Sequence, residues 1–246
     1  MFNFFVDSSM KHGDFYSITG SDFNHIKNVL RMKAGEKFLV SDGGASHLCE
    51  LESIDGTASI VRIIEENFQN TELPIKIYLF QGLPKSDKLE LIIQKTVELG
   101  VAGIIPVEMN RSIVKLDEKK KSSKRERWQA IAESAAKQSK RNIVPEVFDV
   151  TTYKQAMEKA KGLDLLLVPY ENENGMKATA DALSNIKVGS SIGILIGPEG
   201  GFEEKEVAQA IEAGGISISL GNRILRTETA AITSVGMCML YAEMNL

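Results

Sequence analysis

The alternation of strand-like and helix-like segments after residue 75 is the feature of this sequence that most limits its fold. The segments LDLLLVPY (163–170) and SIGILIG (191–197) are almost wholly apolar, whereas SDKLELIIQKTVEL (86–99) repeats apolar residues at helical spacing. Strands that are apolar on both faces are typical of a parallel sheet that helices cover on both sides. This part of the chain therefore predicts an α/β domain.

The elements expected in this domain alternate regularly along the chain. We expect strands at 75–80, 103–107, 144–148, 163–170, 191–197 and 216–220, and helices at 86–99, 122–140, 152–161, 176–184, 203–213 and from 227 onward.

Residues 1–70 follow a different pattern of short alternating runs. FNFFVD, EKFLVSD, HLCELESI and TASIVRII predict strands, and Gly43-Gly44 and Asp55-Gly56 predict two hairpin turns. A helix is expected from Ser21 to about residue 30, because apolar residues recur there at helical spacing. We expect a small β-barrel-like domain over 1–70, a linker from Gln69 to Pro74, and a second domain over 74–246.

Composition excludes several classes of protein. The two cysteines, Cys49 and Cys238, lie far apart, which argues against a disulfide framework and against a metal site. The start MFNFFVD lacks the basic region of a secretion signal, and no apolar run reaches the ~20 residues that span a membrane. We expect a soluble cytoplasmic protein that uses neither membrane nor metal.

Three loops follow predicted strands: VPYENENG (168–175), IGPEGGF (196–202) and LGNRILRTET (220–229). Ligands of open α/β sheets bind beyond the carboxyl ends of the strands, and glycines allow the backbone to approach a ligand closely. The alternative for IGPEGGF is an ordinary turn into the next helix. Its glycines match neither a Walker loop nor a dinucleotide-binding fingerprint.

The segment GNRILRTETAA (221–231) carries more information than the other loops. Thr227 is expected to cap the final helix, but capping does not explain Arg223 and Arg226. The helix that follows is apolar on nearly every side, so we expect it to be buried on nearly every side. Charged groups leading into such an element are costly unless they are paired or bind a ligand.

IGPEGGF together with LGNRILRTETAA is similar to the paired signature of the SPOUT-class RNA methyltransferases, and in particular to the RsmE family of 16S rRNA uridine-N3 methyltransferases. HIKNVLR (25–31), KLELIIQKTVELG (88–100), IIPVEMNRS (104–112) and RWQAIAESAAKQSKR (127–141) extend the resemblance over nearly the whole chain. It implies a PUA-like β-barrel that binds RNA, followed by an α/β domain whose mostly parallel sheet has helices on both faces and ends in a trefoil knot. It also implies the cofactor S-adenosylmethionine and a homodimer.

The resemblance also implies which residues form the site. Backbone groups near the knot would hold the cofactor, at Val168, Ile196, Gly197, Glu199, Gly201, Leu220, Gly221, Ile224, Leu225 and Thr227. Catalysis needs alignment, removal of the N3 proton and stabilisation of charge on the base. We expect Glu199 or Glu228 to act as base or to orient the uracil, and Arg226 to stabilise the charge; the residues leave open which carboxylate does which.

The segment 111–141 holds eleven basic and four acidic residues, a local excess of seven positive charges in a chain of net charge −4. Such a concentration can hold a phosphate backbone, although a solvated surface loop and helix is the alternative. Contacts to 16S rRNA, within the small ribosomal subunit, are expected from Arg111, Lys124, Arg125, Arg127, Lys137 and Arg141, and from His25 and Arg31 of the small domain.

Two other functions remain open. The first is a SPOUT ribose 2′-O-methyltransferase acting on tRNA or rRNA, because one fold can serve different acceptors. The second is a catalytically inactive RNA-binding factor of ribosome assembly. Methylation at pyrimidine C5 is disfavoured, because it usually needs a cysteine nucleophile and both cysteines lie in apolar segments.

Overall fold

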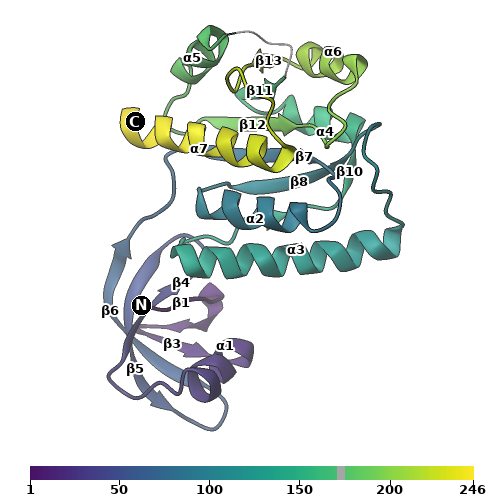
Figure 1. Ribbon diagram of the computed structural model, residues 1–246. Helices are drawn as coiled ribbons and strands as arrows, with labels where there is room; N and C mark the ends of the chain where they lie inside the picture. Colours follow the sequence, from purple (N-terminus) through teal and green to yellow (C-terminus); the bar gives the residue numbers. More distant parts are fainter. Residues whose placement is uncertain (171–174) are drawn as a thin grey trace. The chain divides into compact units, whose positions relative to one another are not determined.

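The computed structural model covers residues 1–246 and describes 1–170 and 175–246 (Figure 1). The chain forms two compact units. The N-terminal unit consists of Met1–Glu72 and Ala136–Val144, and the C-terminal unit consists of Leu73–Ala135 and Pro145–Leu246. The sequence predicts one crossing near residues 70–74, but it does not indicate that 136–144 belongs with the N-terminal unit.

The N-terminal unit is built on a six-stranded sheet in the order β1-β4-β5-β6-β3-β2. Only β1 and β4 pair in parallel. The two predicted hairpin turns join β4 to β5 and β5 to β6. The sequence pattern does not predict β2 and β3, which are short strands of two and four residues. The strands are β1 (Asn3–Phe5), β2 (Lys11–His12), β3 (Phe15–Ile18), β4 (Lys37–Ser41), β5 (Ser46–Ile54) and β6 (Ser59–Gln69).

The helical segment of this unit is short and changes its winding. The helix α1 (Gly20–Asn24) runs directly into a π-helical turn at His25–Val29, where Ile26 is fully buried. Ile26 packs with Phe4 and Phe38 in the core of the unit. A short 3₁₀ turn, Ser8–Met10, precedes β2.

The C-terminal unit contains a seven-stranded sheet, and every strand pair described in it is parallel. The order is β10-β8-β7-β12-β11-β13, and β9 also pairs with β8. This confirms the predicted parallel sheet. The strands are β7 (Lys76–Gly82), β8 (Gly103–Glu108), β9 (Glu146–Val147), β10 (Thr151–Thr152), β11 (Leu165–Pro169), β12 (Ser191–Ile196) and β13 (Gly215–Ile218).

Helices cover both faces of this sheet. The side chains of Phe80, Val168 and Leu195 pack with residues of α4 and α6, whereas α7 packs on β7, on β12 and alongside α2 (Figure 1). None of the described helices is long and apolar enough to span a membrane. The helices are α2 (Lys88–Glu98), α3 (Glu118–Ser139), α4 (Tyr153–Ala160), α5 (Lys177–Ser184), α6 (Glu204–Glu212) and α7 (Thr227–Asn245).

Most helices begin and end within two residues of the prediction, but α3 begins earlier than expected. The Asp117 side chain accepts a hydrogen bond from the backbone N of Lys120 (2.8 Å), so it satisfies a free N–H group at the helix start. In α4, Thr152 and Gln155 bond reciprocally as a capping box.

Within a single chain, the final helix α7 is buried on one side only. Val235, Cys238 and Ala242 are fully buried, whereas Leu240 is 51% and Met244 72% exposed. The sheet and α2 cover only one side of a helix that is apolar around most of its circumference. An apolar strip of α7 therefore remains uncovered within a single chain.

Candidate active site

A pocket of about 690 Å³ lies beyond the carboxyl ends of β11, β12 and β13. Its volume falls within the range of small-molecule sites. The three loops that the sequence singled out follow these strands, although residues 171–174 of the first loop lie outside the described residues. The pocket is lined by Lys88, Pro169, Tyr170, residues 196–202, residues 219–227 and Ala230.

A chain of hydrogen bonds fixes the start of α7 against two strands. The fully buried Gln81, in β7, donates from Nε2 to Thr227 Oγ1 (2.9 Å). Thr227 Oγ1 in turn donates to the Gly197 carbonyl, directly after β12 (2.6 Å). Arg226, and not Thr227, occupies the N-cap position, and no side chain caps this helix. The predicted capping role of Thr227 is therefore wrong, because its hydroxyl bonds across the sheet instead.

Two glycines allow the loops to take these paths. A Cβ atom on Gly82 would lie 2.7 Å from Pro198 N, so only glycine lets the loop after β12 approach the end of β7 this closely. Gly221 has a φ of +98°, in the region that side-chain-bearing residues rarely adopt, at the point where the chain leaves β13.

The segment 222–226 presents free backbone groups to the pocket. Among the described residues, its N–H groups form no hydrogen bonds, and of its carbonyls only that of Arg226 is bonded, accepting from Ala230 N (2.8 Å). Ile224, in the same segment, is 87% exposed. Because unpaired backbone groups seek partners, this segment suits a ligand with a flat apolar body and polar edges, such as a nucleoside.

One cation links two carboxylates at the edge of the pocket. Lys88 Nζ lies 3.0 Å from Glu199 Oε1 and 3.4 Å from Glu228 Oε2. The Glu199 carboxylate also accepts from the backbone N of Lys85 (3.0 Å). Partial burial acts to raise the pKa of Glu199, but the bonds from Lys85 N and Lys88 outweigh it, and this pKa is lowered. The pKa of Lys88 is raised, chiefly by its bond to Glu199.

The two arginines of the loop before α7 have no partner among the described residues. Arg223 and Arg226 are both exposed and form no hydrogen bond or ion pair there through their side chains. Both line the pocket. Their charges are thus available to a bound ligand, as the sequence suggested for charged groups at this position.

The pocket gathers most of the predicted cofactor residues and two of the predicted catalytic residues. Of the predicted cofactor residues, Val168 alone does not line the pocket, because it is fully buried in β11. Of the predicted catalytic residues, Glu199 and Arg226 line the pocket and Glu228 does not. Sequence reasoning missed Lys88 and Tyr170; the position of Lys88 at the start of a helix that follows a strand end was the available signal.

Most basic residues of the 111–141 segment are paired within the chain. Arg111 Nη1 donates to the Gly200 carbonyl (3.1 Å), and Lys124 Nζ lies 5.9 Å from the centre of the Trp128 ring. The ion pairs of residues 111–140 are Arg125 with Glu146 and Asp149, Arg127 with Glu90, Lys120 with Asp117, Lys121 with Glu108 and Glu118, and Lys137 with Asp22. The predicted RNA-binding excess of charge is thus largely balanced by acids.

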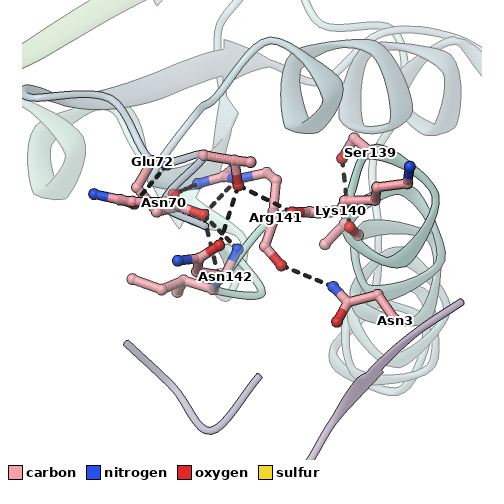
Figure 2. Close-up of polar contacts among 10 residues, drawn as sticks. Asn3, Asn70, Glu72, Ser139, Lys140, Arg141 and Asn142 are labelled. Atoms are coloured by element: carbon pink, nitrogen blue, oxygen red, sulfur yellow. Dashed lines mark hydrogen bonds and ion pairs between the residues drawn. The ribbon is translucent and has the colours of Figure 1, made fainter. Parts of the chain in front are cut away.

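Arg141 lies inside the N-terminal unit (Figure 2). Its guanidinium donates to both carboxylate oxygens of Glu72, from Nε at 3.2 Å and from Nη2, and the residue is only 4% exposed. The same carboxylate accepts from the backbone N of Asn142 (2.9 Å), and Asn3 Nδ2 donates to the Arg141 carbonyl (2.9 Å). This burial does not agree with the predicted contact of Arg141 with RNA.

The two predicted RNA contacts of the N-terminal domain differ in exposure. The His25 ring is half-buried and packs edge-on against Phe4, with ring centres 5.9 Å apart. Arg31 is exposed at a positive φ of 52°, directly beyond the π-helical turn.

Comparison with protein families yields two matches along the chain. Residues 71–239 match the RNA methyltransferase domain, and residues 18–64 match the RNA methyltransferase PUA domain. The first match covers more than half of the chain. The fold is therefore a PUA-like unit followed by a SPOUT-like α/β unit.

Known proteins resemble the chain along nearly its whole length. It is 43% identical to ribosomal RNA small subunit methyltransferase E of Bacillus subtilis, over 93% of this chain and 91% of that protein. It is 35% identical to the protein of that name from Mesomycoplasma hyopneumoniae, over 97% and 99%. The Neisseria gonorrhoeae enzyme of that name, crystallised with S-adenosylmethionine, is 33% identical, with a TM-score of 0.81 and 96% coverage of both chains. The chain belongs to the ribosomal RNA small subunit methyltransferase E family of RNA methyltransferases.

Proposed function

We propose that the protein transfers a methyl group from S-adenosylmethionine to N3 of a uridine in the 16S rRNA of the small ribosomal subunit. The observation that carries this proposal is the pocket, where the mostly unbonded backbone of 222–226 lies with Glu199, Lys88 and Arg226. The family relationship and the cofactor bound by the Neisseria gonorrhoeae relative support it.

The residues of the pocket fit this cofactor. When bound, S-adenosylmethionine supplies an electrophilic methyl group on a sulfonium. Backbone groups of Ile196, Gly197, Leu220, Ile224 and Leu225 would hold its adenine and ribose. Gly201 has a φ of +69°, and a Cβ atom at this position would meet no heavy atom within 4 Å, which leaves room for close approach. Val168 has no part in this set, because it is buried away from the pocket.

The charged residues fit the chemistry at the uracil. N3 of uracil carries a proton that must leave, and a nearby carboxylate is a suitable acceptor or orienting group. Arg226 can donate to a uracil carbonyl oxygen and stabilise the negative charge that develops on the base. Neither cysteine is suited to nucleophilic attack, because burial raises the pKa of both Cys49 and Cys238 to about 12.

We assign RNA binding to cations that form no ion pair within residues 1–170 and 175–246. Lys115 and Lys119, before and at the start of α3, form no ion pair among the described residues, and Arg31 is exposed on the N-terminal unit. Lys124 keeps its ammonium beside Trp128 without an acidic partner in the described chain. These groups can hold phosphates with little dependence on sequence.

The exposed apolar strip of α7 supports a homodimer. Leu240 and Met244 of α7 and Leu91 of α2 are all more than two-fifths exposed, and α2 and α7 pack side by side. Burial of such a strip against a second copy would remove apolar surface from water. Sedimentation at micromolar concentration tests the dimer, and a monomer there would contradict it. The cytoplasm is the proposed location, and the trefoil knot stays a prediction.

Mass spectrometry of ribosomal RNA tests the proposed function. Cells that lack the protein should lose one N3-methylated uridine from 16S rRNA, and purified protein with S-adenosylmethionine should restore it on small subunits. An unchanged rRNA with a lost ribose methyl group in tRNA would favour the 2′-O-methyltransferase instead. Calorimetric titration with S-adenosylmethionine separates an enzyme from an inactive assembly factor, since the latter would show no heat of binding.

A further inference from the structure

Three segments that are distant in the sequence meet at the ammonium group of Lys88. Lys88 is the first residue of α2, Glu199 lies in the loop after β12, and Glu228 lies in the first turn of α7. The two segments that carry the carboxylates are those that form the walls of the pocket. We propose that Lys88 is a positioning residue that holds Glu199 and Glu228 as one charged unit, in which Glu199 faces the substrate and Glu228 is the buried anchor.

The two carboxylates differ in their access to the pocket. Glu199 lines it beside Lys88, and Glu228 does not. Glu228 Oε2 is buried and forms no hydrogen bond among the described residues, so the ammonium 3.4 Å away is its electrostatic partner. A buried carboxylate without a counter-charge is costly, and Lys88 supplies that charge. This division answers the question that the sequence left open, namely which carboxylate can meet a substrate.

Glu199 is held from two directions. Its Oε1 accepts from the backbone N of Lys85 at 3.0 Å and lies 3.0 Å from Lys88 Nζ. Lys85 lies in the loop between β7 and α2, and Lys88 is the first residue of α2, so the carboxylate is bonded to a part of the chain outside its own loop. A carboxylate with two fixed donors keeps one orientation, which is the condition for a group that orients a base.

The remaining charged groups around this unit do not replace Lys88. Asp87 precedes it on the same segment, Arg223 and Arg226 lie on the loop before α7, and Arg111 is bonded to the Gly200 carbonyl. None of these arginines forms an ion pair with either carboxylate in the described structure. Loss of Lys88 therefore removes the only described ion-pair partner of both Glu199 and Glu228.

A titration of the glutamate carboxyl groups tests this inference without any turnover. Protein labelled with ¹³C at glutamate Cδ is titrated by NMR as wild type, Lys88→Met and Lys88→Arg, and Glu199→Gln assigns the signal. In Lys88→Met the pKa of Glu199 should rise toward the ordinary value, because a cation that favours the charged form is gone. Lys88→Arg should keep it lowered. A Glu199 titration that is the same in wild type and Lys88→Met overturns the inference.

Kinetics on small subunits give the second readout, which rests on the proposed function. Lys88→Met should lower kcat about 10²-fold and move the acid limb of the kcat profile to higher pH, with KM for RNA little changed. Lys88→Arg should recover most of kcat. The matched control is Lys95→Met on the same helix, whose ammonium pairs only with Glu98 at 2.9 Å among the described residues and which should behave as wild type. Wild-type kcat in Lys88→Met overturns the role.

The two experiments fail in distinguishable ways. If wild-type protein methylates no uridine, the proposed function fails, and the NMR titration still decides whether Lys88 controls Glu199. If the wild type is active and the Glu199 titration does not respond to Lys88, the inference fails alone. Thermal unfolding of each variant shows whether a loss of kcat comes from a loss of fold.

Discussion

Two regions of the molecule carry cationic side chains, and these side chains are used in opposite ways. In α3 and its flanks, Arg125, Arg127 and Lys137 pair with acids of other segments, and Arg141, beyond the helix, is buried against Glu72. In the loop before α7, Arg223 and Arg226 have no partner among the described residues and line a pocket. The first region has the higher density of positive charge in the sequence. The second has the unpaired charge in the described structure, and this favours it as the ligand site.

The difference follows from where the acids lie. Glu90 and Asp149 lie outside α3 in the sequence, and the fold brings them to Arg127 and Arg125. Glu72 is likewise brought to Arg141, beyond the end of α3. The loop before α7 lines the pocket, and its two arginines form no ion pair with any acid in 1–170 or 175–246. A cation that the fold has already paired gains less from a phosphate, because the existing pair must first be broken.

The largest expected effect is on kcat, and it distinguishes the loop before α7 from α3. Arg226→Ala should lower kcat about 10³-fold with the fold intact, because a donor to the developing negative charge is lost. Arg127→Ala, the matched control from α3, should leave kcat within about twofold. Methylation of small subunits under saturating cofactor measures both. Near-wild-type turnover in Arg226→Ala would remove this residue from the mechanism.

The next effect is on the free energy of unfolding, and it distinguishes a buried ion pair from an exposed one. Arg141→Ala should lower the free energy of unfolding by about 3 kcal/mol, because it leaves the Glu72 carboxylate without its partner in a mostly buried site. Arg127→Ala should leave this free energy almost unchanged, since its pair with Glu90 is exposed on the arginine side and screened by solvent. Urea denaturation measures both. A stable Arg141→Ala variant that has lost RNA affinity would restore the role that the sequence predicts for it.

A smaller effect on stability and cofactor binding is expected from the hydrogen bonds of Thr227, which lines the pocket. Thr227→Val keeps the shape of the side chain but removes the hydroxyl that links Gln81 to the Gly197 carbonyl. We expect a loss of about 1–2 kcal/mol in unfolding free energy and weaker cofactor binding, because the buried Gln81 amide loses one of its two acceptors and the partly buried Gly197 carbonyl loses its donor. Calorimetry and denaturation measure these quantities. Thr233→Val, at an exposed position of the same helix, is the control and should change neither.

The smallest expected effect is on RNA affinity, and it compares a paired with an unpaired cation of α3. Lys119→Ala removes an unpaired cation, and should lower RNA affinity a few-fold and reduce the slope of log affinity against log salt by about 1. Arg125→Ala removes a paired cation and should change this slope less. Binding of a 16S rRNA fragment at several salt concentrations decides between them. Equal slopes for both variants would contradict the distinction between paired and unpaired cations.

The sequence predicts those features that repeat locally. The apolar runs of β11 and β12 predict the parallel sheet, and the three loops after strands predict where a pocket forms, because parallel strands end at a common edge. The change of pattern near residue 70 predicts two domains, and the resemblance adds their PUA-like and SPOUT-like folds. The predicted helix ends miss the observed ones by one or two residues in most helices and by four at the start of α3, because these bounds depend on caps such as Asp117.

The sequence does not predict features that depend on contacts between distant residues. Lys88, Glu199 and Glu228 are separated by more than a hundred residues or by a whole strand and helix, and no spacing rule connects them. The bond from Thr227 to Gly197 and the burial of Arg141 have the same origin. Each of these contacts depends on how the elements pack against one another. Thr227, expected to cap a helix, therefore bonds to Gly197, and Arg141, expected to contact RNA, is buried against Glu72.

The assignment of residues 136–144 to the N-terminal unit bears on how this protein can be divided. The chain passes between the units at residues 72–73, 135–136 and 144–145, so neither unit is a continuous stretch of polypeptide. A fragment that stops at Glu72 has no guanidinium for that carboxylate, and its complement carries an Arg141 without an acceptor. The PUA-like unit of this protein therefore cannot be removed as one continuous segment. A gene fusion or truncation that cuts the chain after Glu72 separates a buried charge from its counter-ion.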